Sequence, residues 1–221
     1  MLNVWGLVGS YVLIFLIIGI STVLQKKNIV GDEGARKFIH IGVSNWWILA
    51  MFFFKGDDAV WYAIIAPFTF IILNYLSYRL NLLKAMERGG QGNLGTVYFP
   101  ISLLILVALT FGVLDNPFIG AVGILVMGYG DGLAAVIGKK YGKKKLAFGK
   151  SLEGSLTMFI TSFVVVFAIS MFTQSVLISL LLAMGVAAFA TLIELFTPKG
   201  LDNLSVPLGS SLIFYLLLLI L

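Results

Sequence analysis

The sequence contains no cysteine and few charged residues. Of its 221 residues, 11% are charged and 60% are hydrophobic, whereas a soluble domain usually carries about 25% charged residues. This composition excludes a soluble globular protein. Because each membrane-spanning helix takes about 20 residues, the length also excludes a separate soluble domain. The absence of cysteine excludes disulfides, thiolate metal sites and cysteine nucleophiles.

Charged residues divide the chain into apolar stretches that predict membrane helices. Residues 154–193 carry no charge, and the polar residues at 173–175 are the turn that decides between seven and eight spans. We therefore expect an all-α polytopic membrane protein, a single integral-membrane domain over 1–221 with about eight transmembrane helices. The predicted helices are 4–24, 38–54, 59–78, 95–114, 117–138, 154–172, 175–196 and 205–221.

The distribution of lysine and arginine predicts the topology. The odd-numbered connections hold 14 of the 15 basic residues, and Lys55 is the exception. Since basic residues concentrate in cytoplasmic loops, both termini are expected on the non-cytoplasmic side. Residues 1–25 contain no charged side chain, so they are expected to form a retained first helix rather than a cleavable signal peptide. The net charge of +5 thus reflects topology, and no nucleic-acid partner is expected.

Acids, bases and amides gather in four predicted cytoplasmic loops, at 25–40, 79–98, 128–154 and 194–207. The predicted outer face carries few charges. This one-sided distribution predicts an active site facing the cytoplasm at the inner surface of the cell membrane. The residues concerned are Arg36, Lys37, His40, Glu87, Arg88, Asp131, Lys150, Glu153, Glu194, Asp202 and Asn203.

Asp131 is the most informative single residue. It lies about seven residues inside the end of the predicted helix 117–138, or roughly 10 Å along its axis. A carboxylate at that depth needs a cation, a base or a water-filled cavity. Its neighbours Gly130 and Gly132 would let a backbone, a metal or a phosphate come close. A structural ion pair inside the bundle is the alternative interpretation.

The connection 138–154 interleaves glycines with six lysines. Backbone amides and ammonium groups together suit a polyphosphate, although a basic loop also serves topology or contact with anionic lipid. The residues 149–151 read Gly-Lys-Ser, but the upstream glycine spacing of a P-loop is missing, which argues against a Walker-type ATPase. Arg36, Lys37 and His40 share one helix face and could bind a phosphate or position an alcohol.

Five sequence blocks, at 34–42, 95–100, 130–138, 149–155 and 201–207, occur in the order and spacing of a known family. They resemble the membrane-embedded CTP-dependent lipid-alcohol kinases, the group of dolichol kinase, phytol kinase and the CTP-dependent diacylglycerol kinase. The resemblance covers nearly the whole chain. It implies transfer of the γ-phosphoryl group of CTP, or another nucleoside triphosphate, to the hydroxyl of a membrane lipid, with isoprenoid alcohols of the phytol, polyprenol or dolichol type expected first.

The resemblance also implies roles for particular residues. Asp131, with Glu153 or Asp202, would hold Mg²⁺, a cation that favours carboxylate and phosphate oxygens. The general base is left open among Asp131, Asp202, Glu194 and His40. The residues expected around the nucleotide are Arg36, Lys37, Gly130, Gly132, Lys139, Lys140, Lys150, Ser151 and Asn203.

Three other functions are alternatives to an isoprenoid-alcohol kinase. A diacylglycerol kinase would use the same chemistry on another lipid. A phosphatidate cytidylyltransferase, a distant relative, would carry a Ser-Pro pair and a terminal His-Gly-Gly, both absent here. A small-solute transporter would show an internal repeat with polar groups near the midplane, and no repeat is found. The expected partners are a lipid alcohol and a nucleoside triphosphate, and a homodimer is left open.

Overall fold

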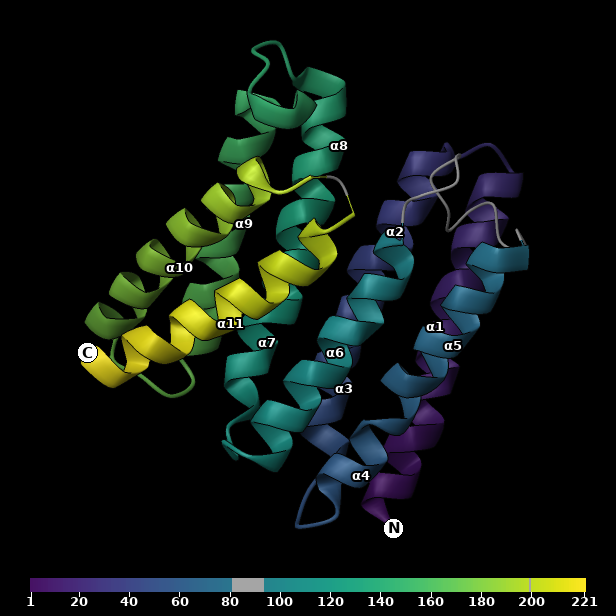
Figure 1. Ribbon diagram of the computed structural model, residues 1–221, viewed down its shortest axis with the longest axis vertical. Coiled ribbons are helices and arrows are strands. Elements are labelled where there is room, and N and C mark those ends of the chain that lie inside the picture. Colours follow the sequence, from purple (N-terminus) through teal and green to yellow (C-terminus); the bar gives the residue numbers. More distant parts are fainter. Residues whose placement is uncertain (81–93, 199) are drawn as a thin grey trace. The chain divides into compact units, whose positions relative to one another are not determined.

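The computed structural model describes residues 1–80, 94–198 and 200–221, which fall into two compact units, Met1–Pro117 and Phe118–Leu221 (Figure 1). Lys84, Glu87, Arg88 and Lys199 lie outside the described residues, as does most of the predicted loop 79–98. The expectation of one membrane domain over 1–221 stays a prediction.

The regular elements of the first unit are all helices in its described residues. They are α1 (Leu2–Lys26), α2 (Asp32–Ser44), α3 (Trp46–Phe53), α4 (Ala59–Ala63), α5 (Ile65–Leu80) and α6 (Gly95–Gly112). The second unit is helical apart from an isolated bridge between Lys145 and Ser151. Its elements are α7 (Pro117–Leu125), the π-helix η1 (Val126–Asp131), α8 (Gly132–Tyr141), the 3₁₀ turn η2 (Ala147–Gly149), α9 (Leu152–Ser170), α10 (Val176–Phe196) and α11 (Asp202–Ile220).

Seven helical segments of the described residues are long and apolar enough to cross a membrane. This confirms the all-α polytopic class. The uncharged stretch 154–193 is divided at 171–175, as predicted, because Ser175 caps α10 by accepting a hydrogen bond from the Ile178 amide. The seven segments are Leu2–Lys26, Ala59–Leu80, Gly95–Gly112, Pro117–Tyr141, Leu152–Ser170, Val176–Phe196 and Asp202–Ile220.

The remaining predicted span, 38–54, consists of two helices, α2 and α3. They separate at Asn45, whose side chain donates to the carbonyl of Ile41 at 2.8 Å and so competes with the helix ladder. The pair runs antiparallel to α1: the Ser21 hydroxyl donates to the carbonyl of Ala35, and further along the Trp46 indole donates to Ser10. With only 13 residues, four of them charged, α2 does not have the length or the composition of a membrane span.

The predicted helix 117–138 is interrupted by the π-helix η1. Single π turns inside α-helices are uncommon and often mark functional sites. η1 ends at Asp131, which is 6% exposed. The predicted helix 205–221 begins three residues earlier, at Asp202, because that side chain accepts backbone hydrogen bonds at the start of α11.

Small residues allow close helix packing in the second unit. Gly123 in α7 faces the carbonyl of Pro207 and the hydroxyl of Ser211 in α11, so tightly that a Cβ atom would collide with both. The Ser211 hydroxyl donates to the Ile119 carbonyl at 2.8 Å. Membrane helices associate through such contacts because burial from lipid gives no hydrophobic gain. The α7–α11 pair therefore depends on glycine at position 123.

We predict that Gly123→Ala lowers the free energy of unfolding by about 1–3 kcal/mol, because the new methyl group meets backbone that cannot give way. The measurement is the thermal unfolding midpoint in detergent. Gly19→Ala in α1 is the control, since no atom lies within 4 Å of its added Cβ, and alanine favours the helix. Equal midpoints for Gly123→Ala and the unaltered protein would contradict this account of the packing.

Candidate active site

A short hairpin between α8 and α9 positions Lys150. The Leu146 amide donates to the carbonyl of Lys150 at 2.8 Å, and the Leu152 amide donates to the carbonyl of Lys144 at 2.9 Å. The chain reverses at Gly149, whose φ of +74° is readily adopted by glycine. The order of residues in this loop thus fixes where the backbone of Lys150 lies, directly before the start of α9.

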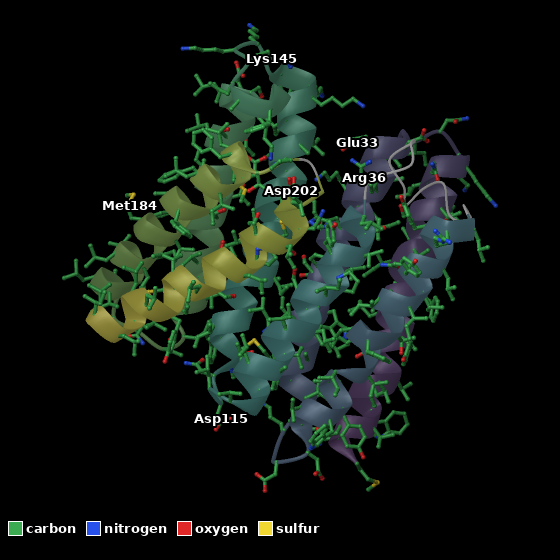
Figure 2. The ribbon with its side chains drawn as sticks, in the orientation of Figure 1. Glu33, Arg36, Asp115, Lys145, Met184 and Asp202 are labelled. Atoms are coloured by element: carbon green, nitrogen blue, oxygen red, sulfur yellow. The ribbon has the colours of Figure 1, made fainter. Side chains whose placement is uncertain are left out.

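Lys150 differs from the other five lysines of this connection. Its side chain is only 11% exposed and is directed into the second unit. The others are exposed, and Figure 2 shows Lys145 projecting at the outer end of the hairpin. Among these six lysines, the structure therefore sets Lys150 apart. The exposed members are Lys139, Lys140, Lys143, Lys144 and Lys145.

The buried ammonium group of Lys150 contacts two carboxylates. It donates a short hydrogen bond to Oε1 of Glu194, near the end of α10. Its Nζ also lies 3.7 Å from Oδ2 of Asp202, at the start of α11. Glu194 and Asp202 are each 4% exposed. One cation from the hairpin therefore joins the ends of two membrane helices in a buried ion cluster, defined here as Lys150, Glu194 and Asp202.

Gly200 and Asn203 hold the side chain of Asp202 in place. Its Oδ1 accepts hydrogen bonds from the backbone amides of Gly200 at 3.0 Å and Asn203 at 3.1 Å. The side-chain amide of Asn203 donates to the same oxygen and to the carbonyl of Gly200. Gly200 has a φ of +99°, which a residue with a side chain rarely adopts. The Asn203 side chain thus fixes the backbone at Gly200 and the carboxylate of Asp202 relative to each other.

Asp131 lies near this ion cluster. Its negative charge and that of Asp202 both act on Glu194. The adjacent Gly130 faces Met158 and Ser162 of α9, where a Cβ would lie 2.7 Å from the Met158 sulfur. Glycine at position 130 thus lets η1 lie close against α9, and Gly132 is buried as well. Asp131 thus lies within electrostatic range of Glu194, and its predicted pairing with Glu153 or Asp202 stays a prediction.

Ser151 and Glu153 have structural contacts at the start of α9. The Ser151 hydroxyl caps the helix by accepting from the Gly154 amide at 3.2 Å, and it sits against Gly138 of α8 and Gly142 directly after that helix. The carboxylate of Glu153 faces the backbone of Lys143 and Lys144 in the hairpin. Neither side chain is among the groups that contact the Lys150 ammonium in the described residues.

The predicted residues of α2 belong to the first unit. Arg36 forms an ion pair with Glu33 one turn earlier, and Figure 2 shows the two side by side. Lys37 is 5% exposed. The His40 ring packs against Phe99 of α6 with centroids 4.9 Å apart. The second unit therefore gathers Asp131, Lys150 and Asp202 by itself, and the roles of the α2 residues stay predictions.

Glu194 is the member of the ion cluster to which sequence analysis gave least weight. The sequence places it among the polar residues of the predicted cytoplasmic face and among four candidate bases, without a partner. A signal was present, because it is the only charged residue of α10, and a lone carboxylate in an apolar helix usually has a function. What the sequence could not supply was its partner, 44 residues away in the hairpin.

Within the described residues, no three histidine, aspartate or glutamate side chains are grouped closely enough to form a metal site by themselves. Magnesium does not require such a group, since it commonly takes one or two carboxylates together with water and substrate phosphates. The carboxylates of Asp131 and Asp202 are of the right chemistry for this. The predicted set of Asp131, Glu153 and Asp202 stays a prediction.

Several known proteins are similar to this chain in sequence. The chain is 34% identical over 217 residues to a phytol kinase of Synechocystis, an alignment covering 94% of this chain and 88% of that protein. It is 30% identical to phytol kinase 1 of Arabidopsis thaliana, covering 87% of this chain and 69% of the relative. A probable phytol kinase 1 of rice (Oryza sativa) is 32% identical, covering 95% and 71%. No family model and no solved structure matches.

These alignments define a class of membrane-embedded kinases that act on the hydroxyl of a lipid. The chain belongs to the phytol kinase family of lipid-alcohol kinases.

We predict that Lys150→Met destabilises the protein by about 3–5 kcal/mol, because it leaves two buried carboxylates without their cation. Lys144→Met, at an exposed position, should change stability by no more than about 0.5 kcal/mol. The measurement is again thermal unfolding in detergent.

A double variant tests whether the pairing itself is responsible. Lys150→Met combined with Glu194→Gln should cost less than the sum of the two single substitutions, because the second removes the uncompensated charge that the first creates. Strict additivity would show that Lys150 and Glu194 are not energetically coupled.

Proposed function

We propose that the protein transfers the γ-phosphoryl group of CTP to the hydroxyl of an isoprenoid alcohol, with phytol as the first candidate and polyprenol or dolichol as others. The curated relatives named above support the choice of phytol, because each carries phytol kinase in its name. The choice of CTP over other nucleoside triphosphates rests on the family resemblance of the five sequence blocks.

The observation that carries the proposal is the buried ion cluster of Lys150, Glu194 and Asp202. Phosphoryl transfer needs little covalent help from the protein and depends on positioning and charge neutralisation. A lysine held by two carboxylates has few conformations available, so it can meet a phosphate oxygen at small entropic cost. The exposed lysines of the hairpin lack such restraint and are better suited to attracting a polyanion to the surface.

Other residues complete the proposed nucleotide site. Arg36, Lys37, Lys139 and Lys140 would add positive charge around the triphosphate, while Ser151, Asn203 and the backbone at Gly130 and Gly132 would approach it. Asp131, with Asp202 or Glu153, would hold Mg²⁺. When bound, that ion would neutralise charge on the phosphates. Asp131 lies at the end of η1, and the hydroxyl of the lipid alcohol would lie at the same depth in the membrane as this carboxylate.

The relatives favour a kinase over the other functions considered. The names of the curated relatives describe neither a cytidylyltransferase nor a transporter. Diacylglycerol kinase activity differs only in the acceptor and is the second candidate. The acceptor is therefore the variable that the first assay must resolve.

The purified protein in lipid vesicles with Mg²⁺ and γ-labelled CTP is expected to label phytol, with polyprenols and diacylglycerol tested in parallel. Asp131→Asn should reduce transfer by at least about 100-fold, because a neutral amide is a weaker ligand for Mg²⁺ and the charge on the phosphates would then be less well neutralised. Labelling of diacylglycerol alone would move the assignment to the second candidate. Transfer of the cytidyl group from α-labelled CTP to phosphatidate, with no γ-label on any alcohol, would replace the kinase proposal.

We further propose that the site faces the cytoplasm, with both termini on the opposite side of the cell membrane. The chain has no cysteine, so single cysteines report accessibility without background. In intact cells, Lys55→Cys should react with a membrane-impermeant maleimide, whereas Lys144→Cys should react only after the membrane is opened. The reverse pattern would invert the proposed orientation.

A further inference from the structure

Glu194 occupies an unusual position for a carboxylate. It is the only charged residue of α10, it lies two residues before the helix ends, and it is 4% exposed. A carboxylate in such surroundings costs several kcal/mol unless it is compensated. The Lys150 ammonium compensates it through Oε1. The residue is therefore held rigidly, by one of its two oxygens.

The second carboxylate oxygen of Glu194, Oε2, differs from Oε1 in its hydrogen bonding. Oε2 of Glu194 is buried and accepts no hydrogen bond from any of the described residues. An acceptor left in this state loses the hydration it would have in water and gains nothing in return. Such groups are rare in folded proteins, and each calls for an explanation, of which a catalytic role is one.

The other carboxylate of the ion cluster is engaged through both of its oxygens. Oδ1 of Asp202 accepts from two backbone amides and from the Asn203 side chain, and Oδ2 faces Lys150. A carboxylate that already accepts this many hydrogen bonds is a poor proton acceptor. Of the two carboxylates that contact Lys150, Glu194 is thus the one with an oxygen that none of the described residues engages.

We propose that Oε2 of Glu194 accepts the proton of the lipid alcohol during phosphoryl transfer. This inference rests on the proposed function. The alcohol oxygen bonds to the γ-phosphorus while the bond from that phosphorus to the bridging oxygen breaks. The nucleoside diphosphate leaves with the electron pair, and the hydroxyl proton passes to Glu194. Lys150, on the other oxygen, would hold the carboxylate next to the phosphate that it helps to neutralise.

The test compares kcat and the KM for CTP from pH 5 to 9 in vesicles containing phytol. Glu194→Gln keeps the size and the oxygen that meets Lys150 but cannot take a proton. It is expected to lower kcat by about 100-fold, to leave KM within about threefold, and to abolish the fall of kcat at low pH. Asp115→Asn makes the same chemical change at an exposed turn and should behave as the unaltered protein.

Several results would overturn the proposal. If Glu194→Gln raises KM and leaves the pH profile of kcat unchanged, Glu194 is a positioning residue for Lys150. If it retains kcat within about threefold, Glu194 has no such role. Glu153 also has a buried oxygen without a partner in the described residues, so loss of the low-pH limb in Glu153→Gln, but not in Glu194→Gln, would transfer the role to Glu153.

Two controls separate failures of different kinds. If Glu194→Gln does not fold, Glu194→Asp retains a carboxylate, and an unshifted low-pH limb in that variant would contradict the proposal. If the unaltered protein labels no alcohol at any pH, the proposed function itself fails and the inference with it. Activity in the unaltered protein together with undiminished activity in Glu194→Gln rejects the inference alone.

Discussion

The buried contact between Lys150 and Glu194 is the interaction on which the rest of the site depends. Charges in a membrane helix are costly, and removing one partner of a buried pair leaves the other uncompensated. The hairpin before α9 must therefore deliver the lysine accurately, and the turn at Gly149 and the Ser151 cap do so. On the other side, α10 must place its one carboxylate opposite that lysine. A single cation thus joins the hairpin to the end of α10 and to the start of α11, about 50 residues further along the chain.

Close packing in the second unit places Asp131 near this contact. The π turn at the end of α7 changes the direction in which residues project, and Gly130 lets η1 lie directly on Met158 of α9. Gly123 serves α11 in the same way. Gly123 and Gly130 therefore have a packing role in the second unit, and the predicted approach of the Gly130 backbone to the nucleotide stays a prediction.

The sequence sufficed for the architecture because membrane helices are set by length and apolarity, which are local properties. It predicted the break between α9 and α10 at the polar residues 173–175, which lie within the observed connection 171–175. It did not show the division of 38–54 at Asn45, which depends on a side-chain bond to Ile41, or the π turn before Asp131. For the site, Lys150 and Asp202 were named from motifs, whereas the weight of Glu194 depended on a contact across 44 residues. Such a contact has no local signature.

The central claim is that Lys150, held by two carboxylates, meets the phosphates of the nucleotide. The most direct measurement is equilibrium binding of a non-hydrolysable CTP analogue with Mg²⁺ to the full chain in vesicles, for the unaltered protein, Lys150→Arg and Lys144→Met. The account predicts that Lys150→Arg, which keeps the charge but changes its geometry, weakens binding at least about tenfold while Lys144→Met binds normally. Equal affinities for Lys150→Arg and the unaltered protein, or a larger loss in Lys144→Met, would contradict it.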